Sequence, residues 1–574
     1  MNETVEIIFG LIGGLALFLY GMNSMSDALQ KTAGDSMKKV LSILTRNAVT
    51  GALAGAIVTA VLQSSSATTV MVIGFVSAGL MTLPQGISVI FGANIGTTMT
   101  AQLMAFKISN YIYPIIFIGF MINFCCKKER IKNIGTVLFS FGLLFEGIEI
   151  MGGVMKPLAS SAIFLDLMGK VTDIPILGVC LGAVMTLVVQ SSSATIAVLQ
   201  NFASQAAADG VSSVIGLAGA IPILLGDNIG TTITALLASI GQSKDAKRTA
   251  IAHSIFNISG SVLFLFLLKP FTSFVKMISP TGNEVDVISR QIANAHTCFN
   301  IAVTLIWIPL LPIMVKIVNF LIKGDDKNAV INSAPKYLDE RVISQPLPAM
   351  YLVSQEIIRL SDFTSGMIAN LKGMLTSGRS ADAEVKYNDS YQTVKSLQDS
   401  ISVYITKLFA SGNLTEDQSE QTAGLLVVAN NIERIADRCE DISQTDSKIR
   451  LSGKKMTDKA FEEISNCLDI TDDLFTDAIS SVETGDTAKA EEVIKGRKRM
   501  KDVQRKNNKA HLNRVKKKIC DASLTAPYSG IMYNLERATD NCAGIAEEVM
   551  DSLTFVKLDE DELKRLDEVK ADEK

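Results

Sequence analysis

Two copies of one polar phrase interrupt otherwise apolar stretches of this 574-residue chain. The sequence QSSSAT occupies Gln63–Thr68 and again Gln190–Thr195. A companion phrase follows each copy, GANIGTT at Gly92–Thr98 and GDNIGTT at Gly226–Thr232. Hydroxyl and amide groups are costly in hydrocarbon unless they have partners, so the duplication predicts two equivalent polar sites within a membrane. Such duplication is typical of transporters built from repeats.

Charge divides the chain into an apolar part and a soluble part. Residues 1–323 contain 19 Lys and Arg against 14 Asp and Glu, whereas residues 324–574 contain 35 against 44. A mildly basic apolar half joined to an acidic half indicates a membrane domain followed by a water-soluble domain. The domains predicted from this change are a membrane domain over 1–323, a linker over 324–347, a soluble helical domain over 348–560 and a charged tail over 561–574.

Each QSSS phrase lies near the middle of a long apolar segment, 48–82 in the first copy and 174–209 in the second. A bilayer is crossed by about 20 helical residues, so segments of this length with polar centres are poor single spans. Two half-helices that meet at a tip inside the membrane fit better, because irregular backbone is tolerated there when it lines a cavity. We therefore expect a re-entrant hairpin in each segment.

The repeat extends beyond the phrases, because two glycines and a threonine precede each of them at the same spacing. One unit covers about 5–124 and the next about 134–268, with a final span over 291–322. Each unit is predicted to have three full crossings, and an odd number inverts the second copy. The expected fold is all-α: two inverted repeats whose hairpin tips face each other near the midplane.

The distribution of basic residues predicts the orientation in the membrane. With seven full crossings and a cytoplasmic C-terminal domain, the inside loops hold 11 basic residues and the outside loops six. This bias agrees with the positive-inside rule. We expect a multi-pass protein of the cell (inner) membrane with its N-terminus outside and its C-terminal domain in the cytoplasm.

The chemistry of the phrases suits an anion accompanied by cations. A QSSS tip offers hydroxyls and the free N–H groups of a helix N-terminus, which favour anions. Gln oxygens and backbone carbonyls suit a small hard cation such as Na⁺, and the companion phrases add amides and hydroxyls. No basic residue occurs in any of the four phrases. Ser, Thr and Gly also mediate close helix packing in membranes, but recurrence of both phrases in register favours a binding site.

Two further features leave alternatives open. Asp227 stands in the second companion phrase where the first has Ala93, and it could ligate an extra cation, carry a proton or cap a water-exposed helix end. The related phrases AHSIFN at 252–257 and AHTCFN at 295–300 place His and Asn on helices. A structural hydrogen-bonding role is favoured for them over a proton relay.

The paired phrases resemble those of the sodium/phosphate cotransporter family, the type II group and its bacterial relatives, over about residues 1–320. The resemblance implies Na⁺-driven symport of inorganic phosphate through inverted repeats. It assigns phosphate binding to the serines Ser64, Ser65, Ser66, Ser191, Ser192 and Ser193. It assigns Na⁺ to neighbouring oxygens, and the expected ligands, with Asp227 as a further candidate, are Gln63, Asn94, Thr97, Thr98, Gln190, Asn228, Thr231 and Thr232.

The soluble half also contains a repeat. NIERIADRC at 431–439 matches NLERATDNC at 534–542, and Glu and Asp four apart share one helix face. The two carboxylate pairs, Glu433 with Asp437 and Glu536 with Asp540, could hold a divalent cation or form a solvated surface with internal Glu–Arg pairs. Apolar periodicity predicts six helices over 348–378, 384–411, 415–450, 457–484, 487–522 and 526–555.

This half resembles the PhoU family of phosphate-signalling regulators over about 345–555. The resemblance implies two three-helix bundles with metal-binding motifs at the carboxylate pairs, and a regulatory role for the domain. The expected partners of the whole chain are inorganic phosphate, sodium ions, the lipid bilayer and a second copy or a cytoplasmic regulator, but no nucleic acid. An exporter of the same fold and a membrane-anchored phosphate sensor are the alternatives.

An enzyme is not expected, because no nucleophile–base arrangement or nucleotide-binding loop appears and the chain has only three histidines.

Overall fold

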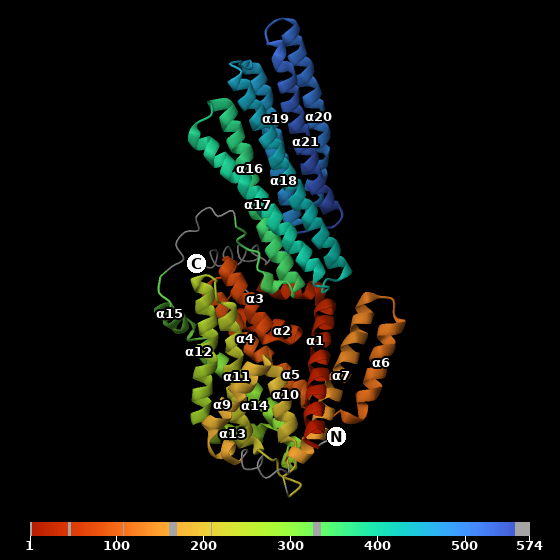
Figure 1. Cartoon of the computed structure of the whole chain (residues 1–574), viewed down its shortest axis with the longest axis vertical. Helices are drawn as coiled ribbons and strands as arrows, with labels where there is room; N and C mark the ends of the chain where they lie inside the picture. The colour runs from red at the N-terminus through yellow and green to blue at the C-terminus, as the bar shows by residue number, and fades with distance from the viewer. Residues whose placement is uncertain are drawn as a thin grey trace, which may run out of the picture. The chain divides into compact units, whose positions relative to one another are not determined.

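The computed structural model describes residues 3–43, 47–106, 108–159, 169–207, 209–324 and 334–556, and these residues are predominantly helical (Figure 1). Within them, the only β-pairing is an isolated bridge between Ala206 and Ser213. The all-α prediction is confirmed. The described residues form two compact units, one up to residue 324 and the other over 334–556.

The first unit is a bundle of helices of very different lengths, labelled as in Figure 1. Its helices are α1 (Glu3–Ile43), α2 (Ala48–Leu62), α3 (Ser65–Ala78), α4 (Leu83–Gly96), α5 (Thr98–Met104), α6 (Ile112–Cys125), α7 (Glu129–Ala159), α9 (Pro175–Val189), α10 (Ser192–Ala203), α11 (Gly216–Ala238), α12 (Lys244–Phe266), α13 (Leu268–Ile278), α14 (Glu284–Trp307) and α15 (Leu311–Leu321).

Some helices of this unit are long and apolar enough to cross a membrane. Among the described residues, the candidates by length and composition are Val5–Thr32, Glu129–Met155, Gly216–Ala238 and Lys244–Phe266. The segment expected as a final span over 291–322 is formed by two helices, α14 and α15, bent by 83° at the break. Pro309 lies at the bend, where a residue without an N–H cannot continue the helix ladder. The apolar segment 84–104 is divided into α4 and α5 at Thr97, which keeps helical backbone angles of φ −63° and ψ −23°.

Both QSSS phrases break their segments into two short helices, as predicted. Gln63 and Gln190 end the first helix of each pair in the left-handed region, with φ of 51° and 57°. Ser64 and Ser191 then cap the second helix, since their hydroxyl oxygens accept hydrogen bonds from backbone N–H groups three residues on. Helices of 12 to 15 residues are too short to cross a bilayer alone.

The repeated glycines bring the hairpins against the companion helices at backbone distance. A Cβ on Gly55 would lie 2.1 Å from the Val89 carbonyl oxygen, and one on Gly182 would lie 1.9 Å from that of Ile223. Helix α2 thus packs on α4, and α9 packs on α11, with no room for a side chain. This contact explains why small residues precede both polar phrases.

The second unit consists of six long helices: α16 (Pro346–Ser377), α17 (Ala381–Ala410), α18 (Glu416–Leu451), α19 (Asp458–Thr484), α20 (Thr487–Lys516) and α21 (Thr525–Met550). Helices α16–α18 contact one another and so do α19–α21, which confirms two three-helix bundles. The end of α20 was predicted too late, at 522. The helix ends at Lys516 because Lys518 adopts a left-handed φ of 57°.

Candidate functional site

The two QSSS phrases line one cavity of about 250 Å³. All six serines and both glutamines of the phrases contribute to its wall, although 127 positions separate Gln63 from Gln190 in the chain. The sequence-based expectation that the two tips come together is met by the geometry of this cavity. The remaining lining residues are Leu62 at the end of α2 and four residues of α1: Leu19, Met22, Asn23 and Ser26.

The cavity is polar but contains no charged side chain. Helices α3 and α10 both begin at it, at Ser65 and Ser192. The first N–H groups of a helix have no partner inside the helix, and they carry partial positive charge. The wall therefore combines hydroxyl and amide donors with two helix N-termini, a combination that suits a small anion.

Equivalent threonines join the two helices of each hairpin. The hydroxyl of Thr59 in α2 donates a hydrogen bond to that of Thr68 in α3, at 2.9 Å. The corresponding hydroxyl oxygens of Thr186 and Thr195 lie 3.1 Å apart. All four residues are buried. These contacts fix the two half-helices on either side of each tip.

A second pair of equivalent contacts positions the glutamines. Thr100 donates to the Gln63 side-chain oxygen at 2.8 Å, and Thr234 donates to that of Gln190 at 3.3 Å. Gln63 is buried, whereas Gln190 is exposed. Both amide groups thereby lie at the cavity with their carbonyl oxygens already accepting one hydrogen bond.

The companion phrases do not line this cavity. Asn94 and Asn228 are buried, and their side-chain oxygens accept hydrogen bonds from Asn257 at 3.3 Å and Asn300 at 3.4 Å. Asn257 and Asn300 are the last residues of the two AHxxFN phrases. The hydrogen-bonding role expected of these phrases therefore falls to their asparagines.

The threonines predicted as Na⁺ ligands are also buried away from the cavity. The hydroxyl of Thr98 donates to the Ile95 carbonyl oxygen of α4, and those of Thr231 and Thr232 donate to carbonyl oxygens of α11. The structure thus gathers the six serines and two glutamines at one cavity and places the predicted Asn, Thr and Asp ligands outside its wall.

Asp227 lies in the interior of α11 and is completely buried. One carboxylate oxygen accepts a hydrogen bond of 2.6 Å from Thr186, and the other has no hydrogen-bond partner among the described residues. The interpretation of Asp227 as a cap at a water-exposed helix end is wrong, because α11 continues to Ala238. In the first half, Ala93 is equally buried at the equivalent position.

Sequence reasoning missed the contribution of α1. The apolar stretch that begins the first repeat ends at about residue 22, but no proline or glycine interrupts residues 23–32, and the helix continues. Asn23 consequently lines the cavity, and the Ser26 hydroxyl donates to the Leu62 carbonyl at 2.6 Å, next to the first tip. The helical spacing of apolar residues continues past Asn23 and Ser26, and this continuation could have predicted that both residues belong to the same helix as the first span.

In the second unit, three of the four predicted metal-binding carboxylates form ion pairs with basic side chains. Lys395 forms ion pairs with Glu433 and Asp437. Asp540 pairs with Arg497 and Arg537, both at distances below 3.0 Å. Among the described residues, no group of three or more His, Cys, Asp or Glu side chains could hold a metal ion. The expected divalent cation therefore gains no support.

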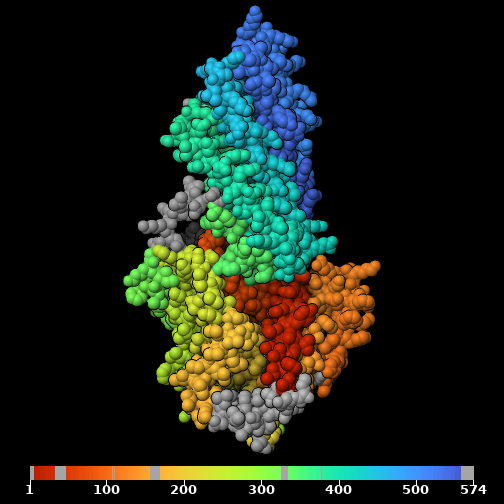
Figure 2. Space-filling view, viewed as in Figure 1, coloured from red at the N-terminus to blue at the C-terminus, as the bar shows by residue number. Residues whose placement is uncertain are grey.

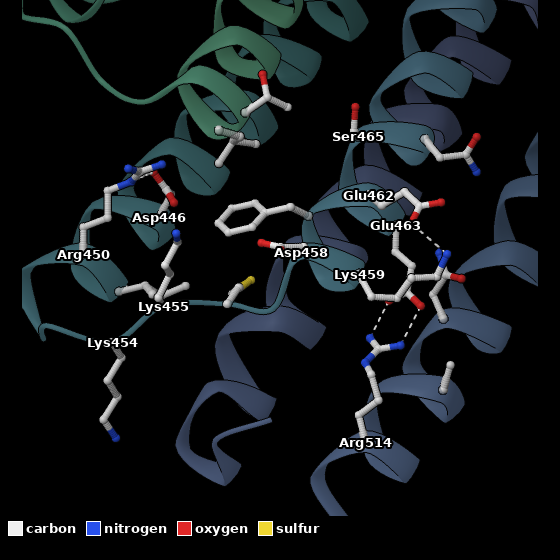
Figure 3. A pocket seen from close by; sticks show the side chains of 18 of the residues that line it. Asp446, Arg450, Lys454, Lys455, Asp458, Lys459, Glu462, Glu463, Ser465 and Arg514 are labelled. Atoms are coloured by element: carbon white, nitrogen blue, oxygen red, sulfur yellow. Dashed lines mark hydrogen bonds and ion pairs between the residues drawn. The ribbon is translucent and has the colours of Figure 1, made fainter. Parts of the chain in front are cut away.

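The same unit contains a larger cavity of about 1400 Å³, shown in Figure 3. Its buried charges compensate one another: Arg514 donates to both oxygens of Glu463, at 2.8 and 2.6 Å, and Tyr528 donates to one of them. Although burial opposes ionisation, these hydrogen bonds hold the pKa of Glu463 below its usual value. We assign no ligand to this cavity.

The apolar helices, the broken hairpins and the neutral polar cavity define a membrane transporter. Comparison with known families is consistent with this class: the Na⁺/Pi-cotransporter model matches residues 17–153 and 155–281, and the PhoU domain model matches 357–445 and 464–549. The chain belongs to the Na⁺/Pi-cotransporter family, a family of phosphate transporters, and carries a PhoU domain.

Similar proteins include chains with and without the second unit. "Uncharacterized protein YqeW" of Bacillus subtilis is 32% identical over 316 residues, which cover 55% of this chain and 98% of that protein. "Putative inorganic phosphate export protein YjbB" of Salmonella typhimurium is 22% identical over 548 residues, 94% of this chain and 97% of that one. Human "Sodium-dependent phosphate transport protein 2B" is 32% identical over 169 residues, 26% and 23% of the chains. No solved structure matches.

Proposed function

We propose that the protein transports inorganic phosphate together with Na⁺ and binds phosphate in the cavity between the two QSSS phrases. The observation that carries this proposal is the joint lining of one uncharged cavity by all six serines and both glutamines. Hydroxyls and helix N-termini can surround phosphate oxygens without a buried Lys or Arg. Bound Na⁺ would then supply the positive charge that the wall lacks.

For Na⁺ we propose two kinds of ligand. Gln63 and Gln190 lie at the phosphate cavity and can share an ion with the bound anion. The buried Asp227, with one carboxylate oxygen unsatisfied among the described residues, can ligate a second ion or a proton. Asn94, Asn228 and the companion threonines would have to exchange their present hydrogen bonds for such an ion.

We further propose that the two halves are inverted repeats and that the cavity opens alternately to either side. The support is the recurrence of the same hydrogen bonds around both tips. The proposed orientation has the N-terminus outside and the PhoU domain in the cytoplasm, where the domain would regulate transport.

Net export is the second candidate, because the Salmonella relative named for phosphate export spans both units of this chain. An exporter and an importer can share this cavity, since the direction of a coupled transporter follows the gradients across the membrane. Measuring phosphate flux in proteoliposomes with Na⁺ imposed on one side or the other separates coupling from direction.

The decisive test combines that flux assay with variants of both tips. Ser65→Ala and Ser192→Ala should each lower Na⁺-driven phosphate uptake by at least about tenfold, because each removes a donor from a shared anion site. Ser254→Ala is the matched control, since its hydroxyl bonds only its own helix and does not line the cavity.

Unchanged uptake in either tip variant would refute the shared site. Uptake that persists without Na⁺ would refute sodium coupling alone. A folded protein that binds phosphate but moves none under any gradient would favour a membrane-anchored sensor.

A further inference from the structure

Helix α20 has a charge opposite to that of the rest of its unit. Residues 495–518 contain 12 Lys and Arg and a single acidic residue, Asp502. The rest of the soluble half, over 324–574, contains 23 basic and 43 acidic residues. So strong a separation within one domain is not needed for packing, because the buried residues of α20 are mostly small or apolar. It points to a partner of high negative charge.

Most of these cations have no ion-pair partner. Lys495 pairs with Glu491 and Glu492, Arg497 pairs with Asp540, and Arg514 pairs with Glu463. Within the part of the chain that the structure describes, no ion pair is found for the others, and all of these are exposed. They are Lys498, Arg499, Lys501, Arg505, Lys506, Lys509, Lys516, Lys517 and Lys518.

Helical spacing places many of them in one line. Positions separated by three or four residues share a helix face, and 21 residues of helix extend about 30 Å. We call this line the basic stripe: Lys495, Lys498, Arg499, Arg505, Lys506, Lys509 and Lys516. A shallow surface hollow of about 440 Å³ runs along its first half, lined by Lys495, Lys498, Arg499, Asp502, Val503 and Lys506. Helix α20 belongs to the part of the chain that is coloured blue in Figure 2.

The basic stripe is narrow because both neighbouring helices are acidic. Helix α20 packs against α19 and α21. Exposed or half-exposed carboxylates of α19 include Asp469, Asp473 and Asp477, and α21 contributes Glu547 on its side. A broad anionic surface would meet these carboxylates as well as the cations. A polymer about as wide as one helix can lie along the cations alone.

We propose that the basic stripe binds inorganic polyphosphate, a flexible linear polymer with a negative charge on every unit. Lysines dominate the stripe, and their compact, rotatable charges suit a uniform flexible polyanion better than a ligand of fixed geometry. The stripe has no aromatic side chain on which nucleobases could stack. Leu512 is the only large apolar side chain of α20 that is exposed, and a single such side chain is too little for stable insertion into a membrane interface.

The choice of a phosphate polymer rests on the proposed function, since a domain joined to a phosphate transporter would then sense a phosphate store. Binding itself does not depend on transport. A polymer seated on the stripe could change how the helical unit acts on the membrane unit, and the first requirement of that idea is the binding site.

The test measures binding of fluorescently labelled long-chain polyphosphate to the full-length protein in nanodiscs of zwitterionic lipid. We expect tight binding that weakens steeply with salt, because neutralised charges release counterions. Free monophosphate should not compete at the same total phosphate. Combining Lys498→Gln, Lys506→Gln and Lys509→Gln should weaken binding at least about tenfold.

The matched control changes three exposed lysines elsewhere, Lys386→Gln, Lys448→Gln and Lys455→Gln, and should retain binding within about twofold. Equal loss in both variants, or no loss in the stripe variant, overturns the site. Tighter binding of duplex DNA or of anionic vesicles than of polyphosphate overturns the ligand. The transport variant Ser65→Ala with Ser192→Ala should bind polyphosphate normally, so failure of the transport proposal is separable from failure of this one.

Discussion

The two halves of the membrane unit build the same contacts from different sequences. Each half has a glutamine in the left-handed region, a threonine pair across the hairpin and an Asn–Asn hydrogen bond to a later helix. The repetition therefore includes hydrogen bonds between residues of different phrases, not only the residues within each phrase. Both halves therefore conserve the geometry of a tip and its support, which is what a site shared between two tips requires.

The halves differ where charge and exposure enter. The second half buries Asp227 where the first buries Ala93, and it exposes Gln190 where the first buries Gln63. In the first half, Thr97 separates α4 from α5 while keeping helical backbone angles, whereas α11 continues through the equivalent Thr231. The two halves thus contribute equivalent residues to one cavity but differ in the charge and exposure of the residues around it. The ion coupling proposed for Asp227 has no counterpart in the first half.

The largest expected effect concerns a feature that both halves share. Gly55→Ala and Gly182→Ala each place a Cβ within about 2 Å of a backbone carbonyl oxygen, so α2 and α9 must leave their companion helices. We expect neither variant to yield monodisperse protein after detergent extraction. Gly13→Ala is the control, since a Cβ there meets nothing within 4 Å. A stable variant in one half only would show that the halves are packed differently.

Asp227 tests the difference between the halves. Asp227→Asn keeps the size of the side chain and removes its charge, and we expect about tenfold weaker apparent Na⁺ affinity with folded protein retained. Asp209→Asn, in an exposed loop, should change nothing. The apparent Na⁺ affinity of both variants is obtained by measuring phosphate uptake as a function of Na⁺ concentration. An unchanged apparent Na⁺ affinity in Asp227→Asn would instead assign the coupling ion to the tips.

Asn23 tests whether the cavity has a third wall. Asn23→Ala removes an amide from α1 at the cavity, and we expect the KM for phosphate to rise several-fold with little change in kcat. Ser24→Ala, on the same helix but outside the cavity wall, is the control. A fall in kcat at constant KM would instead assign Asn23 to helix movement.

The residues of the tips could be predicted from sequence because their polarity stands out in an apolar segment. The repeat, together with the length of a half-helix, was enough to predict that Ser64–Ser66 and Ser191–Ser193 lie at the tips. The polarity of Asn23 does not stand out in this way, since one amide at the end of an apolar span looks like the start of a loop, and only the continued helical pattern points to it. The Asn257–Asn94 contact joins residues 163 positions apart, and no local pattern encodes which helices meet. Glu433 and Asp540 pair with Lys395 and Arg497 on other helices, and the spacing of the carboxylates along their own helices does not reveal these partners.

The smallest expected effect compares the two Asn–Asn contacts directly. Asn257→Ala and Asn300→Ala each remove one buried amide-to-amide hydrogen bond and leave Asn94 or Asn228 with an unsatisfied oxygen. Such a loss costs about 1–2 kcal/mol, and hydrogen bonds between membrane helices fall at the lower end. We expect both variants to lower the thermal unfolding temperature by similar amounts, with Ser254→Ala as control. Because α11 also holds Asp227 beside Asn228, a larger effect in Asn300→Ala would mean that this contact supports the buried carboxylate, and the symmetry of the two halves would then end at the companion helix.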